Sequence, residues 1–267
     1  MISETKQRGG NGTTVSEATR PRRTVYVVLP AYNEVASIGA LLDQIADTLD
    51  EANLQHHVVV VDDGSSDGTS DEVGRHSGRL PLSLVRHERN QGLGATIRDG
   101  LLAAAKLARD DDVIISMDAD GTHGPGFILQ MVRMIVEGYD VVIASRYRDG
   151  SRVLGVPAIR RFMSAASSLL FQVVLPIPGV RDFTCGFRAY RGRVIQKAIA
   201  EFGDRFVDQD GFQCMVDILL KLRKMDVIFC EVPFLLRYDQ KAGASKMKVA
   251  QTAVSTLRLM VRRRLEG

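Results

Sequence analysis

Two pairs of carboxylates stand directly after uninterrupted apolar runs in this chain. Asp62 and Asp63 form the first pair, and Asp118 and Asp120 form the second. Carboxylates at the second spacing, where a buried strand gives way to a loop, suit a hard divalent cation that also takes diphosphate oxygens. We expect both pairs to face one crevice, because open sheets bind ligands beyond the carboxyl ends of their strands.

The first pair opens the stretch DDGSSDGT, residues 62–69. Its glycines permit a sharp turn, and its two carboxylates become acceptors for the hydrogen-bond donors of a base or a ribose. The same letters also fit an ordinary turn that leads into a helix capped at Thr69 or Ser70. Taken alone, this stretch leaves both interpretations open.

A third polar stretch, LPAYNE, follows the first apolar run of the chain. Pro30 should end strand pairing there, because proline has no N–H to donate. Tyr32 can lie flat against a base, and Glu34 can accept a hydrogen bond from a ribose hydroxyl or a base edge. Together these residues suggest one wall of a nucleoside pocket.

A fourth stretch, NQGLGA, opens a predicted helix that contains Arg98. Its glycines, Gly94 among them, would let backbone N–H groups approach a phosphate at the helix N-terminus. Glycine pairs of this kind are also common in plain loops. The stretch therefore predicts phosphate binding only in combination with the other three.

These residues are positioned by short β-branched runs that alternate with segments of helical period, a pattern typical of a parallel sheet covered by helices. The predicted strands are residues 25–30, 57–63, 82–87, 112–120, 140–145 and 227–234. The predicted helices are residues 36–49, 93–109, 125–137 and 212–225. The fold class is therefore α/β, a single domain with a mostly parallel central sheet flanked by helices.

The stretches LPAYNE, DDGSSDGT, NQGLG, DADG and ASRY occur in this order. In this ordered set the chain closely resembles family 2 glycosyltransferases of the GT-A fold, and among them the polyprenyl (dolichyl) phosphate mannose or glucose synthases. The resemblance extends from about residue 24 to residue 247. It implies an inverting, metal-dependent transfer of mannose or glucose from GDP-mannose or UDP-glucose to a polyprenyl phosphate.

The resemblance also implies roles for individual residues. Asp118 and Asp120 would bind Mg²⁺ or Mn²⁺ against the diphosphate, and the metal would neutralise charge that develops on the leaving group. The residues expected to bind the nucleotide sugar are Pro30, Tyr32, Glu34, Asp62, Asp63, Gly94, Arg98, Asp118, Ala119, Asp120 and Lys246. The residues expected to be catalytic are Asp118, Asp120, Arg146 and Asp182.

Two positions depart from the family pattern. Relatives often carry Gln as a further metal ligand two residues after the second Asp, where this chain has Thr122, so water or His123 is left to fill that place. Lys246 belongs to a loop, residues 243–247, which resembles one that closes over the nucleotide sugar. Many relatives carry Arg five residues before the serine of this loop, where this chain has Gln240. A simple exposed basic loop is the alternative.

Arginines followed by an apolar segment bear on the acceptor. Arg146, Arg160 and Ser164 match positions that contact the acceptor phosphate in the lipid-linked synthases, and the planar fork of arginine suits a phosphate dianion. Ordinary surface basicity is the alternative. Residues 162–180 are largely apolar but interrupted by serine, glutamine and proline, which favours an interfacial or buried helix over a membrane span. Such a helix would cradle an isoprenoid chain, or else belong to the core.

The stretch DFTCGFR, residues 182–188, matches a family region that shapes the sugar and acceptor pocket, so Arg188 joins the expected phosphate ligands. A phosphate acceptor needs no general base, because a phosphomonoester with a second pKa of about 6 is largely ionised near neutrality. An alcohol acceptor would need a carboxylate base. The candidates for that base are Asp182, Asp208, Asp210 and Asp217.

The two ends of the chain carry different signals. Residues 1–23 are rich in glycine, threonine, serine and charge and lack the apolar core of a signal peptide, which predicts a disordered tail. The glycosyltransferase domain is expected over residues 24–235. Residues 236–267 would form a basic loop and an amphipathic helix that lies on anionic lipid, or that packs against the sheet or a second subunit.

Composition and charge limit the partners. Of the 267 residues 45% are hydrophobic and 25% are charged, which is ordinary for a globular protein, and the net charge of +3 gives no indication of a nucleic-acid partner. Cys185, Cys214 and Cys230 match neither a disulfide framework nor a zinc site, so we predict reduced core thiols. We expect a cytoplasmic enzyme bound peripherally to the membrane face, with a membrane-protein partner or a second copy as further options.

Two rival functions stay open. The first is a family 2 enzyme that acts on a soluble or protein hydroxyl. The second is a nucleotide-sugar binding protein without turnover, which the departures at Thr122 and Gln240 suggest. The sequence favours neither GDP-mannose nor UDP-glucose, because base selection depends on loop contacts that the shared motifs do not encode.

Overall fold

The computed structural model of the protein describes residues 22–240. Its strands are β1 (Thr24–Ala31), β2 (Gln55–Asp62), β3 (Leu82–Arg86), β4 (Val113–Ser116), β5 (Val141–Ser145), β6 (Arg152–Leu154), β7 (Arg188–Arg191), β8 (Phe229–Pro233) and β9 (Leu235–Arg237). Its helices are α1 (Val35–Glu51), α2 (Thr69–Arg75), α3 (Leu93–Leu107), α4 (Phe127–Val136), α5 (Ala158–Val174), α6 (Gly192–Phe202) and α7 (Cys214–Leu222), with 3₁₀ turns η1 (Gly203–Val207) and η2 (Tyr238–Gln240).

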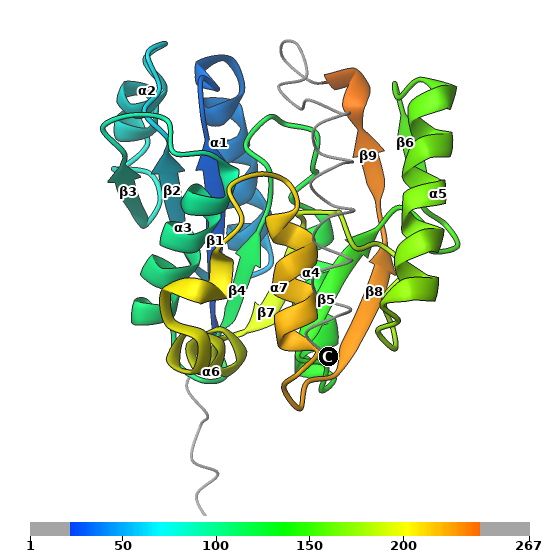
Figure 1. Ribbon diagram of the computed structural model, residues 1–267. Coiled ribbons are helices and arrows are strands. Elements are labelled where there is room, and N and C mark those ends of the chain that lie inside the picture. Colours follow the sequence, from blue (N-terminus) through cyan, green and yellow to red (C-terminus); the bar gives the residue numbers. More distant parts are fainter. Residues whose placement is uncertain (1–21, 241–267) are drawn as a thin grey trace, which may run out of the picture.

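One sheet of seven strands forms the centre of the molecule, in the order β3-β2-β1-β4-β7-β5-β8, and helices pack against it (Figure 1). The pairs β1 with β2, β1 with β4, β2 with β3 and β5 with β8 are parallel. Only β7 among these seven strands runs antiparallel to its neighbours, β4 and β5. The predicted α/β class with a mostly parallel central sheet is therefore confirmed.

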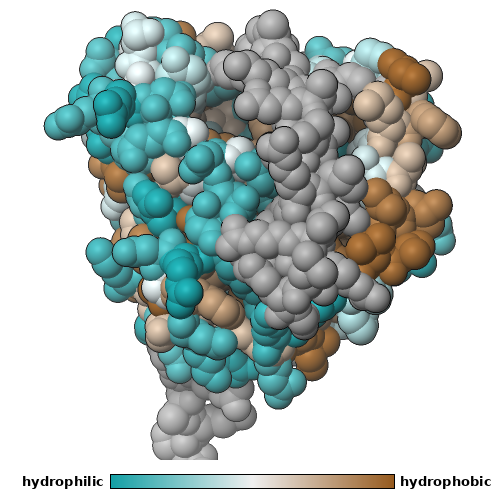
Figure 2. Space-filling model, in the orientation of Figure 1, coloured by the Kyte–Doolittle hydropathy of each residue, from teal (hydrophilic) through white to brown (hydrophobic). Residues whose placement is uncertain are grey.

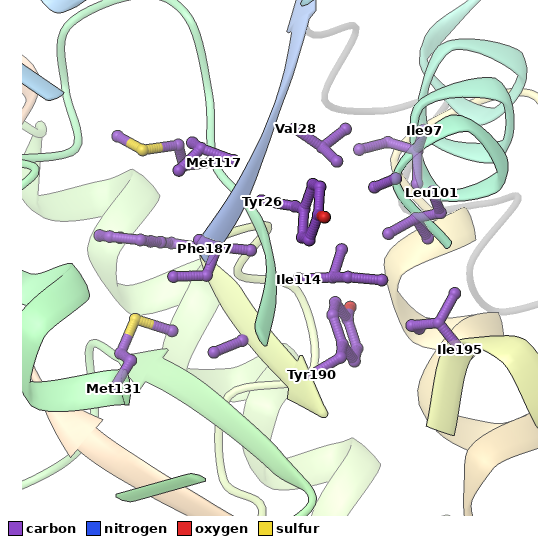
Figure 3. Packing of buried hydrophobic residues seen from close by; sticks show 14 of the residues in the cluster. Tyr26, Val28, Ile97, Leu101, Ile114, Met117, Met131, Phe187, Tyr190 and Ile195 are labelled. Atoms are coloured by element: carbon purple, nitrogen blue, oxygen red, sulfur yellow. The ribbon is translucent and has the colours of Figure 1, made fainter. Parts of the chain in front are cut away.

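The interior is built from β-branched and aromatic residues of the central strands. Val28 of β1 faces Ile97 of α3, and Tyr26 faces Leu101 (Figure 3). Helix α3 approaches the sheet closely at Gly100, where an added Cβ would lie 2.4 Å from a methyl carbon of Val28. A larger residue there would push the helix that follows the NQGLGA stretch away from β1.

All six predicted strands are present, but β7 was not predicted from the sequence. Two of its four residues are arginines, and both are nevertheless buried. Arg191 donates from Nε to the Asp140 carboxylate at 3.1 Å and from Nη2 to the carbonyl oxygen of Ile135 at 2.7 Å. Burial of charge is tolerated only with such partners, and apolar periodicity does not reveal them.

The antiparallel direction of β7 positions the functional loops. Parallel strands end at one edge of a sheet, whereas an antiparallel strand begins there. Residues 182–187, which precede β7, therefore lie at the edge where β4 and β5 end. This brings Asp182 to the segment after β5 and Gly186 to the segment after β4.

Three predicted features fall wholly or partly outside the described residues. They are the N-terminal tail, the basic loop with Lys246, and the amphipathic C-terminal helix. Within residues 22–240, no helix has the length and apolar character needed to cross a membrane. The predicted interfacial or buried helix is α5, residues Ala158–Val174.

Candidate active site

Asp118 and Asp120 leave the carboxyl end of β4 in different environments. The side chain of Asp118 is 41% exposed, whereas Asp120 is 9% exposed. Thr122 donates its backbone N–H at 3.1 Å and its hydroxyl at 2.6 Å to Oδ1 of Asp120. The residue at the position of the relatives' Gln thus orients Asp120.

His123 supports the other carboxylate. The backbone N–H of Asp118 donates to Nδ1 of His123 at 3.1 Å, so the proton of the neutral ring is on Nε2, which lies 3.7 Å from Oδ2 of Asp118. The ring is 4% exposed and stacks on Phe187 with a centroid separation of 5.1 Å. With Nδ1 accepting and Nε2 protonated, His123 offers no lone pair to a metal. The structure therefore argues against His123 as a ligand and makes it a support for Asp118.

The two carboxylates fit a divalent cation that takes its remaining ligands from elsewhere. Across the described part of the chain, no three His, Cys, Asp or Glu side chains gather into a group that could hold a metal. Mg²⁺ commonly binds through one or two carboxylates together with water and substrate phosphates. Asp118 and Asp120 match that mode of binding.

Ser37 connects the LPAYNE stretch to the loop after β4 that carries Asp118 and Asp120, and sequence reasoning missed it. Its hydroxyl lies 3.0 Å from the carbonyl oxygen of Ala119 and 3.1 Å from Oε2 of Glu34. Tyr32, at 36% exposure, lies on the same loop.

Strand β1 does not end at Pro30 as predicted. It continues to Ala31, and Pro30 pairs opposite a residue of β2.

The carboxylates of Asp62 and Asp63 are buried, at 2% and 3% exposure, and both accept hydrogen bonds from the protein. Asp62 accepts the N–H of Ser65 at 2.9 Å and the hydroxyl of Ser70. These bonds fix the turn that leads into α2 at Thr69. The structure therefore argues against Asp62 as an open acceptor for a base or ribose, and it supports the alternative of a turn before a helix.

Asp63 holds the segment before α3. Its carboxylate accepts the N–H groups of Gln91 at 2.8 Å and Gly92 at 2.9 Å, and it lies 2.7 Å from Nδ1 of His87. With three partners inside the protein, Asp63 fixes the segment that leads into α3. Direct contact between Asp63 and a nucleoside, as the resemblance implied, stays a prediction.

The N-terminus of α3 is covered by protein. The N–H of Gly94 donates to the carbonyl oxygen of Asp210 at 3.0 Å, and an added Cβ at Gly94 would lie 1.7 Å from the carbonyl oxygen of Gln209. Glycine is thus required for close packing, and its N–H does not point to an open phosphate site. Arg98 donates from Nε to the neighbouring Asp99 at 2.9 Å. The predicted phosphate role of this stretch is therefore not supported.

Arg146 and Asp182 form the strongest charged contact at this edge of the sheet. Arg146 donates to Asp182 from Nε at 2.8 Å, from Nη2 at 2.7 Å and from its backbone N–H at 3.0 Å. Burial alone would raise the pKa of Asp182, but the attraction and hydrogen bonds of Arg146 hold that pKa below its usual range. Asp182 is fully buried and ionised, so it is suited to holding Arg146 in place and poorly suited to accepting a proton.

Further contacts fix both partners of this pair. Glu231 of β8 accepts the backbone N–H groups of Arg181 and Asp182, both at 2.6 Å. Burial raises the pKa of Glu231. Nη2 of Arg146 also donates to the hydroxyl of Thr184 at 2.6 Å, while its side chain remains 20% exposed. One side of the guanidinium is therefore anchored, and part of it still reaches solvent.

Helix α5 is attached beside Arg146. The hydroxyl of Tyr147 lies 2.7 Å from the hydroxyl of Ser164 on α5. The structure therefore brings Arg146 and Ser164, two of the expected acceptor ligands, to neighbouring positions. Arg160 also belongs to α5, one turn before Ser164.

Arg188 does not join this group. It is fully buried, and it donates to the carbonyl oxygens of Met215 at 2.6 Å and Phe183 at 2.8 Å. The prediction that Arg188 binds the acceptor phosphate is contradicted by this position in the core. Its guanidinium instead connects β7 to α7 and to the loop that carries Asp182.

The other carboxylates considered as bases differ in accessibility. Asp217 is fully buried, and its Oδ2 lies 2.6 Å from Nζ of Lys221. Lys221 also lies 3.2 Å from Asp208. Burial would raise the pKa of Asp208, but hydrogen bonds, first that of Gln209, and the attraction of Lys221 lower it to about 2. Asp208 and Asp210 are both exposed, but Asp208 is paired with Lys221, which leaves Asp210 as the candidate base.

The face of α5 that points to solvent is apolar. Its exposed hydrophobic residues are Ile159, Phe162, Met163, Leu169, Leu170 and Val173. Phe162 and Val173 are 71% and 72% exposed. Figure 2 shows this apolar patch on the side of the molecule where α5 lies. The helix is therefore at the surface and not in the core, which resolves the alternative left open by the sequence.

Comparisons with known proteins agree with these motifs. The sequence profile described as Glycosyl transferase family 2 matches residues 26–198. The chain is 31% identical to the dolichol-phosphate mannosyltransferase of Pyrococcus furiosus over 84% of this chain and 59% of that protein. It is 30% identical to the undecaprenyl-phosphate mannosyltransferase of Micrococcus luteus over 91% of this chain and 96% of that protein. The chain thus spans less than two thirds of the archaeal relative and almost all of the bacterial one.

Solved structures show the same fold. Glucosyl-3-phosphoglycerate synthase from Mycobacterium tuberculosis, in complex with Mn²⁺, UDP and glucosyl-3-phosphoglycerate, has a TM-score of 0.63 at 21% identity, covering 90% of this chain and 80% of that one. The same enzyme with Mg²⁺ and UDP gives a TM-score of 0.62 at 20% identity, covering 91% and 79%. These likenesses confirm the expected GT-A fold.

Proposed function

This chain belongs to glycosyltransferase family 2, and from that premise we propose that it transfers mannose or glucose from GDP-mannose or UDP-glucose to a polyprenyl phosphate. The observation that carries the proposal is the hydrogen bond between Tyr147 and Ser164. It holds the exposed apolar helix α5 beside Arg146. A phosphate bound by Arg146 would thus have an apolar surface next to it for its hydrocarbon chain.

The donor would lie at the carboxyl edge of β1 and β4. Asp118 and Asp120 would hold Mg²⁺ or Mn²⁺, with Thr122 and His123 fixing the two carboxylates. A bound divalent ion supplies positive charge that stabilises the diphosphate as it leaves. Tyr32 and Glu34 border the same edge and would contact the nucleoside. The Mn²⁺ and UDP present in the related synthase support this arrangement.

The acceptor would lie between Arg146 and α5. Asp182 holds Arg146 in one orientation. The side chain of Arg146 therefore loses little conformational entropy when a phosphate binds. Ser164 and Arg160 would complete the contacts from α5. In the reaction, an oxygen of the lipid phosphate forms a bond to the anomeric carbon. The bond from that carbon to the diphosphate oxygen breaks, and its electron pair leaves with the nucleoside diphosphate.

No side chain is needed to take a proton in this scheme, because the phosphate is already ionised. The bonding of the carboxylates supports that view. Asp182 is paired with Arg146, and Asp217 is buried against Lys221. A hydroxyl acceptor would instead depend on Asp210, so an Asp210→Asn variant separates the two functions.

The apolar face of α5 supports peripheral association with a membrane, and the face that we propose is the cytoplasmic one. Exposed Phe162 and Leu169 offer the kind of surface that lies at the boundary between head groups and acyl chains. Exposed Arg161 and Arg152 lie on and next to this helix and would favour anionic lipid. Relatives named for dolichol and undecaprenyl phosphate acceptors support the same location.

The test is transfer of radiolabelled sugar from GDP-mannose and UDP-glucose into an organic-extractable product, with polyprenyl phosphate and Mn²⁺ or Mg²⁺ present. We expect label in the lipid phase with one donor, and none with Asp120→Ala. Metal-dependent donor turnover without label in lipid would favour a hydroxyl acceptor. Binding of the donor without any turnover would favour the non-catalytic alternative.

A further inference from the structure

His87 lies between two carboxylates, just after β3 at the carboxyl edge of the sheet. Its Nδ1 is 2.7 Å from Oδ1 of Asp63, and its Nε2 is 3.0 Å from Oδ2 of Asp99. The residue is 9% exposed. Since both ring nitrogens face carboxylate oxygens, only the imidazolium can donate to both partners, and the neutral ring would turn a lone pair towards one of them.

The charges around this ring balance only when it is protonated. Asp63 comes from the end of β2 and Asp99 from α3, and Arg98 donates to Asp99 at 2.9 Å. Two carboxylates then face two cations. The neighbours of His87 in the chain, Arg86 and Glu88, are exposed. Loss of the ring proton would leave one unbalanced negative charge in a buried position, below an edge where an anionic diphosphate would bind.

Asp63 connects His87 to the segment that enters α3 and to the turn after β2. It accepts the N–H groups of Gln91 and Gly92, so it fixes the segment that enters α3. That segment is packed backbone to backbone against the turn after β2, because an added Cβ at Gly64 would lie 2.7 Å from Cα of Arg89. Movement of Asp63 would therefore displace both loops.

We propose that His87 is a positioning residue for donor binding, which in its protonated form bridges Asp63 and Asp99 and fixes the two loops that border the nucleoside pocket. This inference rests on the proposed function, because it requires that a nucleotide sugar binds at this edge. His87 touches neither the donor nor the reacting atoms. Its replacement should therefore weaken donor binding and leave the chemical step largely intact.

The test compares His87→Gln with the wild type. Glutamine keeps one hydrogen-bond donor but no charge, so it cannot bridge two carboxylates as a cation. We expect the donor KM, and the Kd for GDP or UDP with Mn²⁺, to rise roughly tenfold, the effect of losing one charge-assisted hydrogen bond, while kcat at saturating donor stays within about twofold.

His57→Gln is the matched control. His57 is a half-buried histidine that lies 2.8 Å from the hydroxyl of Ser83, but it stands near the start of β2, at the opposite edge of the sheet. Its replacement should leave the donor KM unchanged. Thermal unfolding of both variants shows whether the fold is retained, and Asp99→Asn provides a second route to breaking the same bridge.

Unchanged donor KM in both His87→Gln and Asp99→Asn would overturn the inference, as would a loss of kcat with an unchanged KM. If the wild type neither binds GDP or UDP with Mn²⁺ nor turns over either donor, the proposed function fails and the inference falls with it. If the wild type turns over a donor and the donor KM is unchanged in both variants, only the proposed role of His87 is refuted, and the proposed function stands.

Discussion

Arg146 and Asp182 are 36 positions apart in the chain, yet they form a two-point ion pair in which Nε and Nη2 of the arginine meet the two carboxylate oxygens at 2.8 and 2.7 Å. A pair of this geometry holds the guanidinium plane in one orientation. Lysine keeps the charge but cannot form the fork. The orientation of Arg146, and not its charge alone, should therefore govern acceptor binding.

We expect Arg146→Lys to raise the KM for polyprenyl phosphate roughly tenfold, because lysine loses the second hydrogen bond and the fixed plane. The donor KM should stay unchanged. Steady-state kinetics with each substrate varied in turn measures both values. Arg148→Lys, at an exposed arginine two positions on, is the control. An equal rise in both KM values would place Arg146 in the donor site instead.

Removal of Asp120 should abolish metal-dependent transfer. We expect Asp120→Asn to lower turnover by about a thousandfold or more, because the charge on the leaving diphosphate is no longer compensated. Mn²⁺ with GDP or UDP should raise the unfolding temperature of the wild type and not that of the variant. Asp226→Asn changes an exposed aspartate and should behave as wild type. Retained turnover in Asp120→Asn would exclude this carboxylate from metal binding.

His123 should affect metal affinity without being a ligand. Because Nδ1 of His123 accepts the N–H of Asp118, we expect His123→Gln to weaken Mn²⁺ affinity about 10- to 100-fold, the range for residues that support metal ligands. Titration of Mn²⁺ at saturating donor measures this effect. At saturating Mn²⁺, turnover should recover. If it does not recover, His123 has a direct role that the hydrogen bonding does not suggest.

The apolar face of α5 should determine binding to lipid. We expect Phe162→Glu and Val173→Glu to reduce sedimentation with anionic lipid vesicles severalfold, because each places a charge where acyl chains would lie. Unfolding temperatures should hardly change, since both side chains are more than two thirds exposed. Val136→Glu on α4, at 52% exposure, controls for the loss of any exposed valine. Equal losses in all three variants would point to general surface charge.

The three thiols should resist alkylation in the native state. Burial raises the pKa of Cys185, Cys214 and Cys230 to about 12 in each case. A raised pKa keeps the thiol protonated, so at about pH 9, where an ordinary thiol is largely ionised, these remain neutral and unreactive. Labelling with iodoacetamide should be slow before denaturation and complete after it. Rapid native labelling of one cysteine would show an opening of the fold at that residue.

The sheet could be predicted from the sequence because its main strands contain continuous apolar runs such as residues 58–61 and 113–115. The carboxylates after these runs were recognised for the same reason, since strand ends meet at one edge. Strand β7 was not predicted, because Arg188 and Arg191 give its sequence the character of a surface segment. Their buried partners lie on other elements, and sequence spacing does not contain that information.

The positions of the predicted site residues differ from one another in what the sequence could reveal. Asp118 and Asp120 follow β4 as predicted, and Arg146 and Ser164 lie at neighbouring positions, while the roles of these four residues stay predictions. Gly94 and Arg188 instead support packing, a role that the residue type cannot reveal because it depends on which carbonyl oxygen lies opposite. His87 gave no local signal, since both of its partners are more than ten positions away, and neither did the contact of Ser37 with the distant Ala119.

The position of β7 between β4 and β5 has a consequence for synthesis of the chain. When residues up to the end of β5 have left the ribosome, β4 can pair with β1 on one side only. Its other edge stays unpaired until β7, which begins at Arg188, has been made. Unpaired edges invite pairing with other chains. The strand that carries the acidic loop therefore keeps one open edge until β7 has been made, and a nascent chain that stalls before β7 should be prone to aggregation.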